Sequence, residues 1–251
     1  MLLAIDIGNT TTKFAIFRKR VLSQRFTHTS LFDLTPTDLI SILVEHGFPP
    51  QVRAVYISSV VKEIENFYRE FSTAYSGAAP VFVDYKCEFG FYVDYHPPES
   101  CGADRLVAAF AAKEKFGAPA IVCDFGTATT IDFISSKPAY KGGIIAPGIN
   151  TLASALFEKT SKLPNVELEI PNKVISHTTV TSIQSGIYFG YVSLVDGLIE
   201  RMFEEAESET KVISTGGFAE LISQHSRYVK LLEPNLILEG LYLLHKKREA
   251  Q

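Results

Sequence analysis

Acidic, hydroxyl and basic side chains gather between two apolar runs near the start of the chain. The segment AIDIGNTTTKFAIF, residues 4–17, places an acid, a glycine, an asparagine, three threonines and a lysine between aliphatic and aromatic flanks. The flanks predict two strands, so the polar residues form the turn of a hairpin. Backbone N–H and hydroxyl groups in such a turn can converge on an anion. The segment is therefore either a phosphate-binding corner or an ordinary polar turn.

A second copy of this pattern makes the binding interpretation stronger. Residues 123–134 read CDFGTATTIDFI, at an offset of 118 residues from the first copy. A repeat at nearly half the chain length indicates a duplicated domain, because solenoid repeats are several times shorter. Two such hairpins could face one nucleotide, with its phosphates and metal, across a cleft. The ungapped alignment pairs Asp6 with Asp124, Gly8 with Gly126, Thr11 with Thr129, Thr12 with Thr130 and Ile16 with Ile134.

Composition is typical of a globular chain. The chain has 251 residues, 46% of them hydrophobic, and a net charge of −4 with one short basic run, HKKRE, near the C-terminus. We therefore expect no nucleic-acid partner. Three cysteines without a CxxC pair fit a reducing cytoplasm. The first apolar run is interrupted at Asp6 and no stretch approaches the roughly 20 apolar residues that cross a bilayer, so we expect neither a signal peptide nor a membrane span.

Hydrophobic patterning predicts strands alternating with helices in both halves. The first half contains expected strands at 1–7, 14–17, 21–26, 54–60 and 80–85, and helices at 36–46, 62–75 and 104–116. The second half contains strands at 120–125, 130–135, 141–148 and 211–217, and helices at 150–157, about 179–206 and after Pro234. This order indicates an α/β protein. Because FGAP at 116–119 breaks the helix, we predict two domains, 1–117 and 118–251.

Seven segments in matching order resemble a known family. They are AIDIGNTTTKFAIF, ISSVV at 57–61, GADR at 102–105, DFGTATT at 124–130, KGGIIAPG at 141–148, TVTSIQSGIYFGY at 179–191 and STGG at 214–217. Together they resemble type III pantothenate kinase, within the superfamily of actin, the heat-shock ATPases and the sugar and acetate kinases. The resemblance implies two duplicated actin-like (ribonuclease H-like) α/β domains with a cleft between them. It also implies ATP-dependent phosphorylation of pantothenate to 4'-phosphopantothenate, the first step of coenzyme A biosynthesis.

The first hairpin carries most of the expected ATP contacts. Gly8 permits close backbone approach, the threonines and amides donate to phosphate oxygens, and Lys13 adds a positive charge. Asp6 is better suited to hold Mg²⁺ through water, because Mg²⁺ keeps several waters and takes few carboxylates. STGG at 214–217 lies either at the adenosine side or in a plain turn before a helix. The expected ATP-binding set is Asp6, Ile7, Gly8, Asn9, Thr10, Thr11, Thr12 and Lys13, joined through the resemblance by Thr127.

GADR, at the start of an expected helix, supplies the candidate catalytic acid. From the residues alone, Asp104 in the first turn is better explained as an acid that stabilises the helix dipole. The resemblance implies that Asp104 is the general base, accepting the proton of the primary hydroxyl of pantothenate, while Arg105 binds the pantothenate carboxylate. The guanidinium fork of arginine suits that carboxylate. The expected substrate-binding set is Tyr95, Gly102, Ala103, Asp104, Arg105 and Thr179.

Three further residues have both a family role and a structural explanation. The resemblance places Tyr95 in the pantothenate pocket, although a loop aromatic can simply pack on the core. Thr179 matches a substrate-contacting threonine and could also be the N-cap of the long helix. Asp124 matches the ligand of a monovalent cation, K⁺ or NH₄⁺, although a second Mg²⁺ acid or a turn former fits the residues equally well.

The long expected helix from Thr179 carries an apolar stripe suited to a core or a partner helix. The family is dimeric, so the resemblance implies a homodimer in which this helix takes part. Two other functions remain open at this point. One is a kinase of another small hydroxylated substrate, and the other is a non-enzymatic relative that acts as an accessory transcriptional regulator. The presence of Asp6, Asp104, Arg105 and Asp124 together favours an active kinase.

Overall fold

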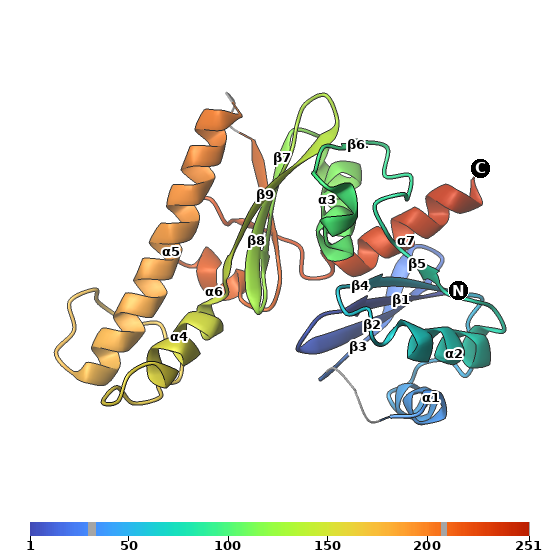
Figure 1. Ribbon diagram of the computed structural model, residues 1–251, viewed down its shortest axis with the longest axis horizontal. Helices are drawn as coiled ribbons and strands as arrows, with labels where there is room; N and C mark the ends of the chain where they lie inside the picture. The colour runs from blue at the N-terminus through green and yellow to red at the C-terminus, as the bar shows by residue number, and fades with distance from the viewer. Residues whose placement is uncertain (30–33, 207–209, 251) are drawn as a thin grey trace. The chain divides into compact units, whose positions relative to one another are not determined.

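The computed structural model describes residues 1–29, 34–206 and 210–250, and the chain forms two compact units. The first unit comprises Met1–Lys115 with Asn235–Gln251, and the second comprises Phe116–Pro234. Figure 1 shows the chain coloured along its length, with both sheets and the helices that pack on them. Both units mix strands and helices, in agreement with the predicted α/β class.

The first unit is built on a five-stranded sheet in the order β3-β2-β1-β4-β5. Strand β1 pairs antiparallel with β2 and parallel with β4, so it lies in the middle of the sheet. Alternate residues of these strands pack against helices α1 and α2 in one hydrophobic core that includes Ile5, Phe14, Ile57 and Phe71. The bounds are β1 Leu2–Ile7, β2 Thr11–Arg18, β3 Val21–Thr29, α1 Pro36–Glu45, β4 Ala54–Ser59, α2 Glu65–Ser76 and β5 Val81–Phe82.

Two more helices complete the first unit, α3 (Ala103–Phe116) and α7 (Leu236–Glu249). Helix α7 packs on β1, β2 and β4. Gly240 lets α7 approach α3 closely, because a Cβ atom there would lie 2.7 Å from Val107. The predicted second domain, 118–251, included the last helix, and the structure places α7 with the first unit instead. Its apolar face is buried on the first sheet, a long-range contact that local patterning does not reveal.

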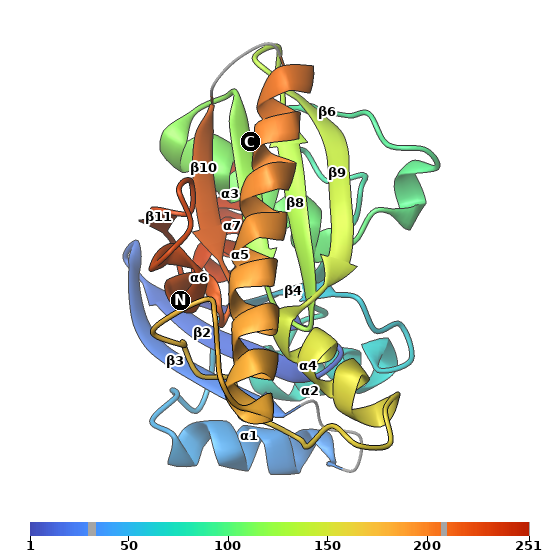
Figure 2. The same ribbon diagram turned by 90° about the vertical axis from the view of Figure 1, so that its left-hand side faces the viewer.

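In the second unit, strands are hydrogen-bonded in the order β11-β10-β7-β8-β9. The 27-residue helix α5 packs along this sheet, as Figure 2 shows. Ile121, Cys123, Phe125 and Ile131 of the sheet form a core with apolar residues of α5. The bounds are β7 Ala120–Phe125, β8 Ala128–Ile134, β9 Ala139–Pro147, α4 Ile149–Glu158, α5 Thr179–Glu205, β10 Lys211–Thr215, α6 Ala219–Ser223 and β11 Leu231–Leu232.

Most expected elements are present, with differences at short segments. The helix expected from residue 62 begins at Glu65, and the strand expected at 80–85 is reduced to Val81–Phe82. Sequence patterning did not predict β6 (Tyr92–Val93), the 3-10 helix Pro98–Ser100, α6 or β11, because two- to five-residue elements show no periodicity. Across the described ranges, no helix combines the length and apolarity needed to span a membrane.

Candidate active site

Strand pairing places three polar side chains in one row across the first sheet. Asp6 on β1 lies directly opposite Lys13 on β2 and, on its other side, opposite Ser58 on β4. Directly paired residues project to the same face of a sheet. The Lys13 Nζ atom lies 3.7 Å from Asp6 Oδ2. Asp6 is 7% exposed, and burial raises the pKa of its carboxyl above the usual value, although the Lys13 charge and the nearby Ser58 hydroxyl lower it.

Ser58 was not among the residues expected at the site, although ISSVV was recognised as a family segment. Its hydroxyl is fully buried and, among the described residues, has no hydrogen-bond partner of normal geometry. The hydroxyl nevertheless lies close enough to Asp6 to lower the pKa of that carboxyl. A buried hydroxyl without a hydrogen-bond partner lowers the stability of the fold unless a ligand or a water molecule forms a hydrogen bond with it. Parallel pairing of β1 and β4 brings Ser58 there, which a hairpin pattern does not indicate.

The first hairpin turns within the predicted segment, between Asp6 and Lys13. Asn9 and Thr10 are exposed, and the Gly8 N–H donates to the Thr11 carbonyl at 3.0 Å. A Cβ atom at Gly8 would lie 3.2 Å from that carbonyl oxygen, so glycine suits this tight turn. Thr11 and Lys13 are half-buried on the face that carries Asp6. The turn and this face together offer amide, hydroxyl and ammonium donors to an anion.

Thr12 and Ile7 lie on the opposite face of the sheet from Asp6. They are paired across β1 and β2 and are 0% and 1% exposed. The Thr12 hydroxyl lies near Tyr68 of α2, whose pKa burial raises to about 12 while Thr12 lowers it. These two side chains therefore belong to the core. Side-chain contact of Thr12 with ATP, as expected from the sequence, does not fit this position, because residues alternate between the two faces of a strand.

The second hairpin repeats the first with a turn shorter by one residue. Asp124 pairs with Thr130, whereas the equivalent Asp6 pairs with Lys13. The Gly126 N–H donates to the Ala128 carbonyl at 3.1 Å, which makes Ala128 the equivalent of Thr11. The ungapped sequence alignment of Thr11 and Thr12 with Thr129 and Thr130 is therefore wrong by one position. A one-residue shift exchanges the two faces of a strand, so Thr129 corresponds to the buried Thr12.

Asp124 is held against main chain at the end of β7. A Cβ atom at Gly216 would lie 2.5 Å from Asp124 Oδ1 and 2.5 Å from the Phe125 nitrogen, and Gly216 has φ +93°. Only glycine fits this close approach without strain. Thr215 of β10 pairs directly with Asp124. STGG thus shapes the surroundings of Asp124, a role that the sequence did not suggest.

Thr127 forms the exposed tip of the second hairpin. Its carbonyl accepts hydrogen bonds from the Gly148 N–H at 3.0 Å and the Thr151 hydroxyl at 2.7 Å. A Cβ atom at Gly148, the N-cap of α4, would lie 2.2 Å from the Gly126 carbonyl oxygen. These contacts bring the tip of the hairpin against the N-terminus of α4, where unpaired N–H groups favour an anion.

The GADR segment gathers the expected substrate residues of the first unit. Asp104 lies in the first turn of α3 and is half-buried, and its Oδ1 accepts a hydrogen bond from the Arg105 N–H at 2.8 Å. A Cβ atom at Gly102 would lie 2.4 Å from the same oxygen. Arg105 is 6% exposed, and its guanidinium carbon lies 5.5 Å from the centre of the Tyr95 ring. The structure thus brings Tyr95, Gly102, Asp104 and Arg105 together.

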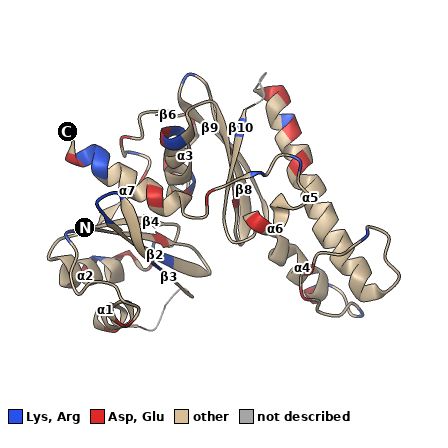
Figure 3. Cartoon of the chain, turned by 180° about the vertical axis from the view of Figure 1, so that it is seen from behind, with Lys and Arg blue, Asp and Glu red and all other residues tan. Residues whose placement is uncertain are grey.

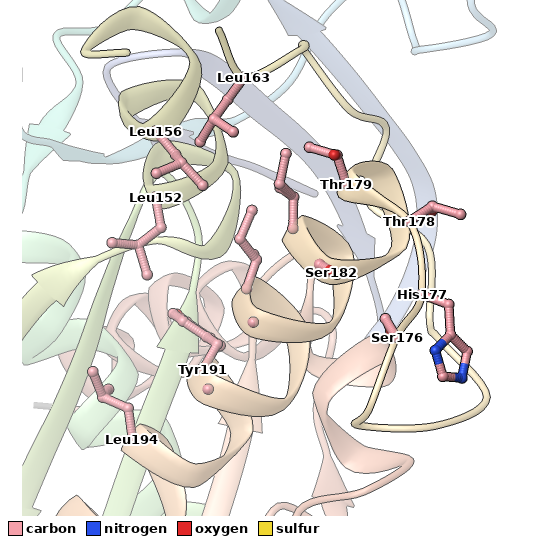
Figure 4. A pocket seen from close by; sticks show the side chains of 14 residues that line it. Leu152, Leu156, Leu163, Ser176, His177, Thr178, Thr179, Ser182, Tyr191 and Leu194 are labelled. Atoms are coloured by element: carbon pink, nitrogen blue, oxygen red, sulfur yellow. The ribbon is translucent and has the colours of Figure 1, made fainter.

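Thr179 is the first residue of α5 and lines a groove, shown in Figure 4. The N-cap is Thr178, which forms a reciprocal capping box with Thr181, so the alternative explanation of Thr179 as the cap is wrong. The groove has a volume of ≈ 780 Å³ and lies between α4 and α5. Leu152, Leu156 and Leu163 form its apolar side, and the exposed Thr179 contributes a hydroxyl at one end.

Another hollow of the second unit lies beside the last glycine of STGG. It has a volume of ≈ 700 Å³ and is lined by Gly217 and Phe218 together with Asn150 and Asn165. A ring beside amide groups and a glycine main chain can accept a flat heterocycle with hydrogen-bonding edges. The hollow thus lies beside STGG, the segment considered from its sequence for the adenosine side.

Comparison with known proteins identifies the family. The sequence profile described as type III pantothenate kinase matches residues 2–201. The chain belongs to this family. A type III pantothenate kinase of Halalkalibacterium halodurans is 40% identical, covering 98% of this chain and 99% of the relative. One of Koribacter versatilis is 37% identical, covering 100% of this chain and 97% of the relative.

Solved structures support the fold. A conserved Baf-family protein of Campylobacter jejuni, described as a transcriptional activator, aligns with a TM-score of 0.64 at 19% identity, covering 99% of this chain and 100% of that one. A Listeria monocytogenes protein described as an N-acetylmannosamine kinase aligns with a TM-score of 0.52 at 11% identity, covering 99% of both chains. These similarities place this type III pantothenate kinase in the actin-like fold shared with sugar kinases.

Kinases of this family use ATP and a divalent metal ion. The first-unit residues fit such an ion, because Asp6 is a buried carboxylate beside an unsatisfied Ser58 hydroxyl. Within the described residues, no three His, Cys, Asp or Glu side chains form a metal-binding group. A single carboxylate with water and phosphate oxygens is a common arrangement for Mg²⁺. When bound, the ion would neutralise phosphate oxygens during transfer.

Proposed function

We propose that this type III pantothenate kinase transfers a phosphoryl group from ATP to the primary hydroxyl of pantothenate, giving 4'-phosphopantothenate in the first step of coenzyme A biosynthesis. The observation that carries the proposal is the family match over residues 2–201, with relatives of that name matched over nearly their full length. Phosphoryl transfer depends mainly on positioning and charge stabilisation. Residues of the two hairpins and of the GADR segment supply the positioning and the charge stabilisation.

Asp104 is the general base of this proposal. Its Oδ1 is fixed by the Arg105 N–H and by the close main chain of Gly102. A carboxylate held in one orientation can accept the hydroxyl proton as the oxygen attacks. Arg105 binds the pantothenate carboxylate while its guanidinium lies against Tyr95. A buried guanidinium on an aromatic face is well oriented for a two-point contact with a carboxylate.

The first hairpin holds the ATP phosphates. Gly8, Asn9, Thr10 and Thr11 present main-chain and hydroxyl donors, and Lys13 supplies the charge nearest to Asp6. Asp6 holds the divalent ion through water. In the second unit, Thr127 contacts ATP from the hairpin tip. The adenosine occupies the hollow beside Gly217.

Asp124 holds a monovalent cation, K⁺ or NH₄⁺, in this proposal. The pairing of β7 and β8 supports the role, since the residue directly opposite Asp124 is the neutral Thr130 instead of a lysine. The carboxylate also lies against the Phe125 main chain at Gly216, where oxygen atoms are close by. Carboxylate and carbonyl oxygens are suitable ligands for hard cations.

The active form is a homodimer that uses α5. Ser182, Gly186 and Gly190 recur every four residues and lie between two grooves of ≈ 780 and ≈ 430 Å³. Small residues at this spacing let another helix approach closely. Val180 and Leu194 of the same helix are 43% and 38% exposed. A second copy covering this surface would also lie over Thr179, the proposed pantothenate contact.

The experiment that tests the proposal is ADP release from MgATP in KCl, with pantothenate compared against sugars and short acids. We expect turnover with pantothenate only. Asp104→Asn should lower kcat by at least about a hundredfold because an amide cannot take the proton. Glu99→Gln, an exposed acid nearby, is the matched control and should retain activity. ATP binding without turnover on pantothenate would contradict the proposal and favour another substrate or a regulatory protein.

A further inference from the structure

A separate cavity lies at the C-terminal end of α7, in the first unit. It has a volume of ≈ 280 Å³, and its lining combines an apolar wall with basic side chains. Tyr56, Val81, Val83 and Leu244 form the wall. Lys86, Cys87, Glu88, Lys247 and Arg248 complete the lining. Two of its cations come from the HKKRE segment, the basic run that the proposed kinase site does not use.

The cations of this cavity are poorly neutralised. No carboxylate oxygen of the described residues lies within 4.0 Å of the charged nitrogens of Lys86, Lys247 or Arg248. The neighbouring Lys246, by contrast, pairs with Glu249. In Figure 3, the ribbon of α7 is coloured blue for Lys and Arg near its C-terminal end. Among the lining residues, Glu88 is the single acid beside three cations, and such an excess of positive charge raises the local affinity for an anion.

The ammonium groups of Lys113 and Lys247 lie close together at Gly90, beside the cavity. At Gly90, the position of an added Cβ atom lies 2.9 Å from Lys247 Nζ and 3.4 Å from Lys113 Nζ. Gly90 has φ +69°, a conformation that glycine adopts readily, and the absence of a side chain leaves the space beside both ammonium groups unfilled by a Cβ atom. Lys113 has one acidic neighbour, Glu114, at 2.8 Å. Convergent lysines on α3 and α7 are typical of a phosphate or carboxylate contact.

We propose that this cavity binds a small organic phosphate, with the phosphate at Lys247, where Lys113 also approaches beside Gly90, and the organic part against Val83 and Leu244. The size favours a small ligand, because drug-sized molecules occupy pockets larger than about 300 Å³. The apolar wall favours a phosphate ester over inorganic phosphate. Nucleic acid is disfavoured by the net charge of −4 and the shortness of the basic run. This inference does not depend on the kinase activity.

Cys87 provides a local reporter for binding. It is half-buried in the lining, whereas Cys101 and Cys123 are buried elsewhere. Burial raises the pKa of the Cys87 thiol, so alkylation by iodoacetamide is best followed at mildly alkaline pH. The experiment measures the rate of Cys87 alkylation by peptide mass spectrometry with glycerol 3-phosphate, inorganic phosphate or glycerol. We expect millimolar glycerol 3-phosphate to slow alkylation severalfold, and glycerol to have no effect.

Paired variants separate the site from general salt effects. Lys113→Gln with Lys247→Gln should weaken the protection by about a hundredfold in concentration, since each lost charge-assisted bond costs roughly tenfold. Lys246→Gln removes a neighbouring cation of α7 outside this cavity and should behave as wild type. Equal protection in the double variant, or none in the wild type, would overturn the proposal. Protection by an oligonucleotide but not by glycerol 3-phosphate would overturn it in favour of nucleic acid.

Discussion

Removing Lys13 should destabilise the first unit far more than removing Asp6. Their charged atoms are 3.7 Å apart, and Asp6 is 7% exposed. Two unit charges about 4 Å apart attract by about 4 kcal/mol at an effective dielectric constant near 20. Losing one partner of a buried pair costs about 3–5 kcal/mol, because the remaining charge is buried without compensation. The Lys13 side chain is 29% exposed, so solvent reduces the expected cost of Lys13→Gln to about 2 kcal/mol.

Asp6→Asn should change stability little or raise it, because burial disfavours the charge that the asparagine lacks. In the double variant, Asp6→Asn should recover most of the loss caused by Lys13→Gln. Urea unfolding at neutral pH, followed by far-UV circular dichroism and tyrosine fluorescence, gives the four free energies of the cycle. Lys62→Gln replaces an exposed lysine and is the control. We expect an interaction free energy of about 2 kcal/mol.

The pH dependence gives this prediction a sharper test. The pKa of Asp6 is raised in the folded state, and loss of Lys13 raises it further. An acid with a raised folded pKa costs stability as pH rises from the unfolded value, 3.8, through the folded value. The penalty of Lys13→Gln should therefore shrink as the pH falls from neutral toward that range. A penalty that is constant with pH, or that Asp6→Asn does not relieve, would refute the charge argument.

Three other outcomes follow from the second unit. Replacing K⁺ by Na⁺ should lower kcat sharply if Asp124 holds a structural cation, and equal rates would remove that role. Light scattering at micromolar concentration should give a dimer, and Gly186→Leu should shift it to monomer by blocking close approach of α5; a monomeric wild type would contradict the interface. Thr178→Ala should lower the free energy of unfolding by about 1 kcal/mol through loss of the α5 cap, while Thr160→Ala, an exposed loop threonine, serves as control.

Local chemistry explains why much of this fold could be predicted from the sequence. The sequence of each hairpin contains an apolar run followed by an acid and a glycine, and this local pattern predicts the turn. In the structure, Gly8 and Gly126 occupy equivalent positions in the two turns. GADR opens α3 as expected, because the acid in its first turn and the apolar residues after it are local signals. These elements are determined by residues close together in the sequence, and hydrophobic patterns and motifs describe such local relations.

Contacts between distant segments were not predictable in the same way. Ser58 reaches Asp6 only through parallel pairing of β1 and β4. Helix α7, which begins at Leu236, joins the first unit through packing on strands β1, β2 and β4, the last of which ends far earlier in the chain at Ser59. Gly216 shapes the surroundings of Asp124 through its pairing neighbour Thr215. None of these partners is near in sequence, so periodicity and motif spacing could not identify them.

The corrected register of the repeat reveals what the two hairpins share and where they differ. Thr12 and Thr129 are equivalent, both fully buried, and each lies beside a tyrosine of a covering helix, Tyr68 of α2 or Tyr191 of α5. In each unit, this threonine and tyrosine lie together on the core-facing side of the hairpin. On the front, the residue opposite the acid is Lys13 in one copy and Thr130 in the other.

That single difference changes the charge beside the acid in two otherwise similar turns. In the first copy, the lysine beside the acid offsets its charge, and the proposal uses the same lysine as a donor to phosphate oxygens. In the second copy, the residue paired with the acid on the neighbouring strand is the neutral Thr130, which is consistent with the cation role proposed for Asp124. If the roles follow from this exchange, Thr130→Lys should abolish the dependence on K⁺ by placing an ammonium group beside Asp124. A Thr130→Lys variant that still required K⁺ would show that the cation lies elsewhere.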